Sequence, residues 1–207
     1  MWAVVVAAGS GQRFGGPKQF TPLRGRPLVQ WSVEAARAVA DGVVLVLPPD
    51  RAGAPDFGAD VVVPGGDSRT ASVRAGLDAV PPSAEVVVVH DGARPLASVE
   101  LFRAVVAAVR AGADAAVPAL AMGDTLKRVE SDTVLATVER DGLVAVQTPQ
   151  AFRAEVLRRA HAGGAEATDD AALVEALGAT VRIVPGDPRN LKVTTTADLA
   201  VAEALVS

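Results

Sequence analysis

A glycine-rich stretch near the N-terminus, from Ala7 to Gln19, holds the first residues whose types and spacing could do chemistry. It follows an apolar run and contains Arg13 and Lys18 among its glycines. Glycines after a strand let backbone N–H groups approach a phosphate and form an anion-binding nest. Phosphoryl transfer needs mainly positioning and charge stabilisation from a protein, which the two basic residues can supply. The stretch therefore predicts a loop that binds nucleotide phosphates.

Two better-known glycine motifs do not match this stretch. A dinucleotide-binding fingerprint requires G-x-G-x-x-G at the start of a helix, but Phe14 stands at the third glycine and Pro17 follows. A Walker A loop requires G-x-x-x-x-G-K-[ST]. Gly11 and Gly16 have that spacing, but Pro-Lys-Gln comes next. The remaining alternative is a flexible glycine loop that binds no ligand. That alternative does not explain why Arg13 and Lys18 occur in the loop, because packing does not require them there.

Two further polar stretches follow predicted strands. Residues 65–72 (GGDSRTAS) join a strand to a helix, so we expect their N–H groups and hydroxyls to point toward the ligand edge of the sheet. Taken alone, the stretch is better explained by Ser68 as the N-cap of the helix and Asp67 as a turn residue. Residues 190–194 (NLKVT) contain Lys192, one of only three lysines among 20 basic residues, as a candidate ligand contact. The alternative interpretation of Lys192 is a solvated surface charge.

A third polar stretch, residues 89–95 (VHDGARP), ends a run of valines. A carboxylate such as Asp91 at the end of a strand, close to phosphates, is typical of a Mg²⁺ site. Arg94 could hold an acceptor phosphate through two parallel hydrogen bonds. We interpret His90 as a packed structural residue and not as a member of a catalytic triad.

The composition excludes several function classes. The 207 residues carry a net charge of −4, with no cysteine and two histidines. This excludes a basic surface for nucleic acid, a thiolate nucleophile and Cys-ligated metals. No apolar run approaches the ~18 residues of a membrane span, and no basic region precedes the first apolar run as in a secretion signal. We therefore expect a cytoplasmic protein that binds neither nucleic acid nor membranes.

The remaining pattern predicts an α/β fold of Rossmann-like type, an open and mostly parallel sheet with helices on both faces. Apolar runs predict strands at 2–8, 43–48, 60–64, 85–90, 114–118, 143–146 and 180–184. Amphipathic segments predict helices at 28–40, 68–79, 98–111, 151–163, 169–177 and 196–206. Start signals include Ser98 and Thr196. Ligands bind at the carboxyl ends of strands in such sheets, where the polar stretches fall.

Residues 124–138 break this alternation, because they hold two polar β-like runs with no helix between them. They predict an inserted β-hairpin arm, at about 121–142, in a single domain of residues 1–207. An isolated hairpin is barely stable in water, so this arm requires a partner surface.

The motifs in this order resemble the 2-C-methyl-D-erythritol 4-phosphate cytidylyltransferases of the non-mevalonate isoprenoid pathway. The resemblance covers nearly the whole chain and implies the nucleotide-diphospho-sugar transferase type of fold. It rests on these stretches: AAGSGQRFGGPKQF, GGDSRTASVRAGL, VHDGARP, DTLKRV, TVERDGL, QTPQAF, TDDAALVE and NLKVTTTADLA.

The resemblance also implies site residues, a metal and a partner. It makes Arg13, Lys18, Arg140 and Lys192 catalytic. The residues implied for the nucleotide are Ala7, Ala8, Gly9, Ser10, Gly11, Gly65, Asp67 and Ser72. The residues implied for the acceptor are Asp91, Arg94, Thr125, Arg140, Thr148 and Lys192, with Asp91 near the Mg²⁺. The implied assembly is a homodimer joined by the arms, in which Arg140 enters the partner's site.

The implied reaction joins CTP to 2-C-methyl-D-erythritol 4-phosphate and releases pyrophosphate, with Mg²⁺ as cofactor. Two alternatives stay open on the residues alone. One is a cytidylyltransferase for another polyol phosphate, such as ribitol 5-phosphate. The other, from a different class, is a non-catalytic dimer module that binds nucleotide.

Overall fold

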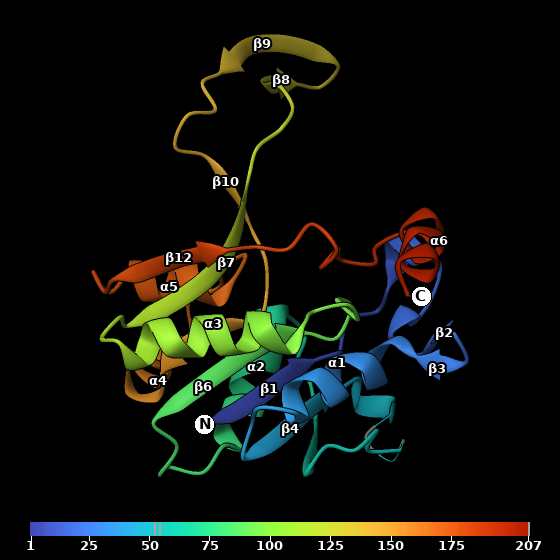
Figure 1. Cartoon of the computed structure of the whole chain (residues 1–207), viewed down its shortest axis with the longest axis vertical. Coiled ribbons are helices and arrows are strands. Elements are labelled where there is room, and N and C mark those ends of the chain that lie inside the picture. Colours follow the sequence, from blue (N-terminus) through green and yellow to red (C-terminus); the bar gives the residue numbers. More distant parts are fainter. Residues whose placement is uncertain (52, 54, 207) are drawn as a thin grey trace.

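The computed structural model describes residues 1–51, 53 and 55–206. In this part of the chain, a central sheet contains the strands β1 (Trp2–Val6), β4 (Gly42–Leu47), β5 (Val61–Pro64), β6 (Val86–Asp91), β7 (Ala115–Ala121), β10 (Val144–Val146), β11 (Gln150–Arg153) and β12 (Val181–Pro185). Their order is β10-β7-β11-β6-β1-β4-β5, with β12 paired to β7 (Figure 1). Neighbours are parallel except for β10 and β11, which run antiparallel to the strands beside them.

Helices cover both faces of this sheet. They are α1 (Leu28–Arg37), α2 (Arg69–Asp78), α3 (Val99–Arg110), α4 (Ala154–Ala162) and α5 (Asp170–Glu175), with α6 (Thr196–Leu205) to one side. Side chains alternate along each strand, so Ala3 and Val5 pack with α1 and α3, whereas Val4 packs with α2, α4 and α5. The predicted α/β fold is confirmed, and continuous apolar strands are buried because both faces are covered.

Two local predictions were wrong. The helix predicted over 151–163 begins only at Ala154, because Gln150–Arg153 forms β11 between β6 and β7. Long-range pairing with two strands overrides the local helical pattern there. The last helix is capped by Thr195 and not by Thr196. Thr195 and Asp198 form a reciprocal capping box, which requires a spacing of three residues.

A small satellite structure lies beside the main sheet. The short strands β2 (Pro22–Leu23) and β3 (Arg26–Pro27) pair with each other, and α6 packs against β2. Leu23, Leu28, Val193 and Ala202 form a separate apolar cluster under it. Val193, in the segment before α6, belongs to this cluster, and Phe14 from the N-terminal part of the chain packs against it.

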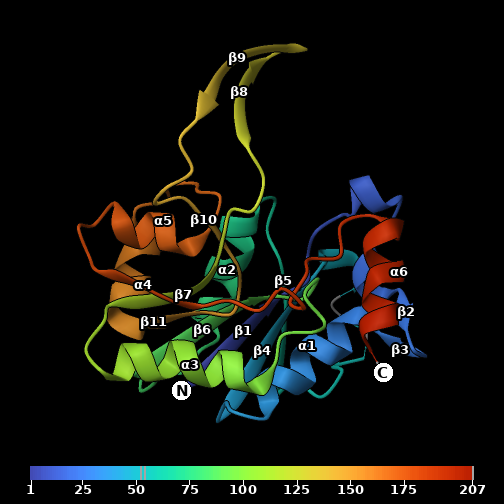
Figure 2. The same ribbon diagram turned by 45° about the horizontal axis from the view of Figure 1, so that its top comes forward.

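The predicted hairpin is present as an arm that projects away from the sheet (Figures 1 and 2). It consists of β8 (Leu126–Glu130) and β9 (Thr133–Val138), joined by a turn in which Ser131 has φ of +52°. Val129, Val134 and Leu135 are more than half exposed on it. None of the helices in the described part of the chain is long and apolar enough to cross a membrane.

Candidate active site

A cavity of about 520 Å³ opens at the carboxyl ends of β1 and β6. Its walls come from the loop after β1, from the start of α2, from the end of β6 and from the segment before α6. This is the edge at which open α/β sheets bind ligands, and the volume suits a small molecule. The predicted residues that line it are Ala7, Ala8, Gly9, Ser10, Gly11, Arg13, Lys18, Asp67, Ser72, Asp91 and Lys192.

The glycine-rich loop keeps its shape through backbone contacts. Gly11 has φ of +69°, and a Cβ atom on it would lie 1.8 Å from the carbonyl oxygen of Gly16, so only glycine fits. The buried Gln19 side chain donates a hydrogen bond to the Gly9 carbonyl at 3.2 Å. Two short 3₁₀ helices, η1 (Gln12–Phe14) and η2 (Lys18–Phe20), carry Arg13 and Lys18 to the cavity wall.

The stretch from Gly65 to Ser72 closes a second wall. A Cβ atom on Gly65 would lie 2.3 Å from Cβ of Ala8, so this glycine allows the two loops to meet. Ser68 caps α2 by accepting a hydrogen bond from the Ala71 N–H, as the alternative interpretation predicted. The Ser72 hydroxyl donates to the Ser68 carbonyl at 2.8 Å. Ser72 therefore braces the loop, and Asp67 is its exposed carboxylate.

Asp91, at the end of β6, is surrounded by basic side chains. Its Oδ2 accepts a hydrogen bond from Lys192 Nζ at 2.7 Å, and its Oδ1 lies 3.4 Å from Arg69 Nε. Arg94 Nε is 4.0 Å from Oδ2. Burial opposes ionisation, yet Lys192, Arg69 and Arg94 together outweigh it and hold the pKa of this carboxyl well below its usual range. Asp91 is therefore ionised at neutral pH.

The cavity carries an excess of positive charge. Its basic lining residues are Arg13, Lys18, Arg69 and Lys192, against the carboxylates of Asp67 and Asp91. The pKa of Lys18 is lowered by desolvation and by the nearby charges of Lys192 and Arg13, although Asp91 partly opposes this. Cations that repel one another in a partly desolvated site are poised to bind a polyanion such as a triphosphate.

Thr148 and His90 lie behind Asp91 and hold its backbone. The Thr148 hydroxyl accepts from the Asp91 N–H at 3.0 Å and lies 3.1 Å from His90 Nδ1. His90 Nε2 lies 3.2 Å from the Arg94 carbonyl, a geometry in which Nε2–H donates and Nδ1 accepts. Burial lowers the pKa of His90 to about 4, so the ring is neutral. These bonds give His90 a structural role.

Arg94 and Thr148, both predicted to bind the acceptor, do not line the cavity itself. Arg94 is mostly buried, and its guanidinium donates to the Asn190 carbonyl at 2.7 Å. Burial lowers its pKa, and Asp91 opposes that effect. Arg94 and Thr148 contact Asp91 without lining the cavity.

Two predicted residues lie on the arm, away from the cavity of their own chain. Thr125 precedes β8 and is exposed. Arg140 follows β9, is exposed, and donates to the Gly123 carbonyl at 2.6 Å. Within one chain, neither lines the cavity. Their assignment to the acceptor stays a prediction that requires a second subunit.

Asp91 as a magnesium ligand also stays a prediction. In the described residues, no three His, Cys, Asp or Glu side chains gather closely enough to hold a metal ion. Both oxygens of Asp91 already face basic groups. Mg²⁺ in nucleotide sites is commonly held by substrate phosphates with one or two carboxylates. The donor set fits an ion carried by a triphosphate and does not form a metal cage.

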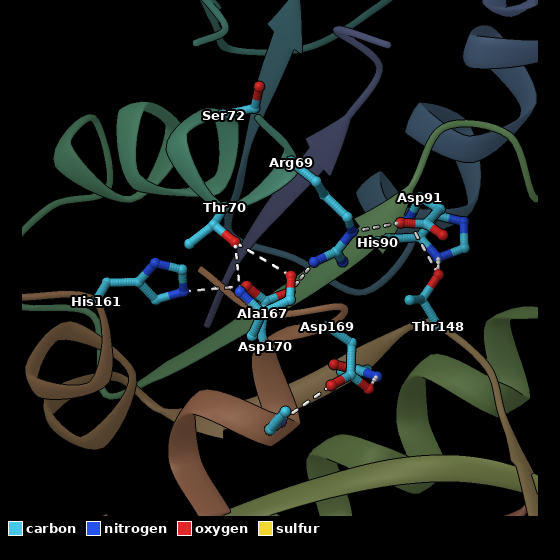
Figure 3. Close-up of polar contacts among 12 residues, drawn as sticks. Arg69, Thr70, Ser72, His90, Asp91, Thr148, His161, Ala167, Asp169 and Asp170 are labelled. Carbon is cyan, nitrogen blue, oxygen red and sulfur yellow. Dashed lines mark hydrogen bonds and ion pairs between the residues drawn. The ribbon is translucent and has the colours of Figure 1, made fainter. Parts of the chain in front are cut away.

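Sequence analysis missed Arg69, which lines the cavity and bridges two carboxylates (Figure 3). Arg69 Nη1 donates to Asp170 Oδ2 at 2.8 Å, and Asp170 Oδ1 lies 3.0 Å from His161 Nε2. Asp169 caps α5, which explains one carboxylate of the Asp169-Asp170 pair. Asp170, the second carboxylate, is buried in the helix and has no capping role. A second acidic residue beside the cap was the signal in the sequence that could have indicated a basic partner.

Comparisons with known proteins show the family of the chain. The family model of 2-C-methyl-D-erythritol 4-phosphate cytidylyltransferase matches residues 1–207. Relatives of that name from Streptomyces avermitilis and Deinococcus radiodurans are 46% and 47% identical, over 99% and 98% of this chain and 91% and 88% of theirs. The crystal structure of the Thermus thermophilus enzyme of that name superposes with a TM-score of 0.85 at 41% identity, covering 98% of this chain and 96% of that one. The chain belongs to the 2-C-methyl-D-erythritol 4-phosphate cytidylyltransferase family.

Proposed function

We propose that this chain joins CTP to 2-C-methyl-D-erythritol 4-phosphate, giving 4-diphosphocytidyl-2-C-methyl-D-erythritol and pyrophosphate for isoprenoid precursor biosynthesis. Family membership over the whole chain supports the reaction. The observation that carries the proposal is the cavity itself, in which a glycine-rich loop and four basic side chains meet at the carboxyl edge of the sheet. The cytoplasm stays the predicted location.

The chemistry requires two anions to meet. An oxygen of the acceptor phosphate attacks the α-phosphorus of CTP in line, and the bond from that phosphorus to the bridging oxygen breaks. Pyrophosphate leaves with the electron pair, and no covalent enzyme intermediate is needed. Arg13 and Lys18, in the glycine-rich loop, are assigned to the α-phosphate, and Lys192, in the segment before α6, is assigned to the acceptor side.

We assign Mg²⁺ to the triphosphate, with Asp91 as the nearest protein carboxylate. When bound, the ion would neutralise part of the phosphate charge and favour departure of pyrophosphate. The residues of the chain then position the nucleotide around it.

We propose that the arms join two chains into a homodimer, so that Arg140 completes the partner's acceptor site. The support is the exposed aliphatic surface of the hairpin and the absence of Arg140 from the lining of its own chain's cavity. The exchange is reciprocal in a twofold dimer.

A product assay tests the function. The protein is incubated with Mg²⁺, one of four nucleoside triphosphates and either 2-C-methyl-D-erythritol 4-phosphate or ribitol 5-phosphate, and pyrophosphate is followed. We expect release with CTP and the erythritol acceptor. Preference for ribitol 5-phosphate would change the substrate, and CTP binding without pyrophosphate release would indicate the non-catalytic module.

A further inference from the structure

A chain of charged and polar side chains, here called the charge chain, links Lys192 and Asp91 in the cavity wall to the interior of the molecule; Figure 3 shows its part from Asp91 to His161. It passes from Lys192 to Asp91, then to Arg69, Asp170 and His161, with contacts of 2.7, 3.4, 2.8 and 3.0 Å. The chain connects β6 to α2, α5 and α4. Its inner members, Asp170 and His161, do not line the cavity and touch none of the groups assigned to the reaction except through Arg69.

The inner end of this chain is fixed by its hydrogen bonds. The side chains of Asp170 and His161 are 1% and 2% exposed. His161 occupies one oxygen of Asp170, so the other oxygen can only face Arg69. Asp170 and Asp91 together outweigh the desolvation of Arg69 and raise the pKa of its guanidinium.

Arg69 has the geometry of a bridge. It uses Nη1 for Asp170 and Nε for Asp91, and two separate nitrogens in a rigid plane transmit orientation from one carboxylate to the other. Asp91 in turn presents its other oxygen to Lys192. A second contact joins α2 to the segment before α5, because the Thr70 hydroxyl is 3.4 Å from both N and O of Ala167.

We propose that Asp170 and His161 are positioning residues that act through Arg69 to orient Asp91 and Lys192 in the site. This inference rests on the proposed function for its kinetic consequence, but the orientation itself exists without substrate. If Asp170 is replaced by Asn, Arg69 keeps only Asp91 as a carboxylate partner among the contacts described above. It then competes with Lys192 for that carboxylate, and Lys192 is displaced.

The kinetic test uses Asp170→Asn, which keeps the side-chain shape, and Arg69→Lys, which keeps the charge but cannot bridge with two nitrogens. We expect kcat to fall about tenfold in each, as for misplaced reacting groups, with the KM for CTP little changed because the glycine-rich loop is untouched. Adding Asp170→Asn to Arg69→Lys should lower kcat no further, because the bridge is already broken.

The matched control is Val174→Ala on the same helix, which removes buried apolar contacts of α5 without touching the charge chain. We expect it to lower the melting temperature at least as much as Asp170→Asn while kcat stays near the wild-type value. A loss of kcat in Val174→Ala equal to that in Asp170→Asn would overturn the proposal, because instability alone would then explain both.

A second test needs no substrate and uses the small number of lysines. With ¹⁵N-labelled lysine, the side-chain NMR signals of Lys18, Lys127 and Lys192 are assigned by single substitutions. Asp170→Asn and Arg69→Lys should shift the Lys192 signal and leave that of Lys127, on the arm, unchanged. An unmoved Lys192 signal in both variants would overturn the proposal. An inactive wild-type protein whose Lys192 signal still responds would overturn only the proposed function.

Discussion

The arm and the buried charge chain show opposite ways of using polar and apolar residues. On the arm, Val129, Val134 and Leu135 are 57%, 56% and 55% exposed, whereas Asp170 and His161 are almost completely buried. Burial of a large aliphatic side chain contributes about 1.5–3 kcal/mol, so the arm leaves stabilisation unused. These buried polar groups are tolerated because each is hydrogen-bonded, Asp170 to Arg69 and to His161. A single chain forms the basic cavity and supplies these hydrogen-bond partners, whereas the apolar surface of the arm stays exposed on that chain.

The largest expected effect lies on the cavity side. Lys18→Ala and Arg13→Ala should each lower kcat at least ~10²-fold, because we propose that both place positive charge where charge develops on the α-phosphate. The measurement is steady-state pyrophosphate release. Arg103→Ala, an exposed arginine of α3, is the matched control and should stay near normal. Near-normal turnover in either loop variant would contradict its assigned role.

The next effect tests whether the cavity of one chain is completed by the arm of another. Lys18→Ala and Arg140→Ala, unfolded and refolded together, should recover about a quarter of normal activity from two nearly inactive parents. Random pairing makes about half of the dimers mixed, and each mixed dimer has one site without either change. If mixed dimers form and the mixture stays inactive, Arg140 acts within its own chain.

A smaller effect separates the arm from the cavity. Val129 and Val134 are cross-strand partners, so Val129→Lys with Val134→Glu preserves the hairpin with an ion pair but removes apolar surface. We expect weaker dimerisation in analytical ultracentrifugation and at least ~10-fold lower activity at low protein concentration, with unchanged CTP affinity by calorimetry.

The control for the arm changes charge without removing aliphatic surface. Glu130→Lys with Thr133→Glu alters another registered pair of the same hairpin and should leave the dimer intact. Dimerisation that resists the valine changes would show that the arm surface does not join the chains.

The smallest effect concerns the buried His90 and is a dependence of the free energy of unfolding on pH. The folded-state pKa of His90 is lowered to about 4, below the ~6.5 of an unfolded histidine. Its contribution to the free energy of unfolding is therefore fully present above about pH 6.5 and falls toward pH 4, by up to about 1.4 kcal/mol per pH unit. Urea unfolding of the wild type and His90→Gln between these pH values measures it. If the free energy of unfolding changed equally with pH in the wild type and in His90→Gln, the expectation would be contradicted.

Local signals in the sequence were sufficient for much of the fold. The valine-rich runs, the caps at Ser68 and Ser98, and the polar hairpin depend on neighbouring residues, so their structures were predictable. The strand β11 was not, because Gln150–Arg153 becomes a strand only between β6 and β7. The Thr195 cap was missed because several threonines adjoin, and Asp198 selects among them by spacing.

The same division holds for the site. The sequence by itself determined the glycine-rich loop, the basic residues Arg13 and Lys18 and the order of polar stretches after strands, because each is encoded in adjacent residues. Only the tertiary structure decided that Arg69 joins Asp91 to Asp170, a partner 101 residues away, since that contact depends on how α2 and α5 pack on the sheet. It also decided that Ser72 braces its loop, and that the cavity of a single chain is lined without Arg140.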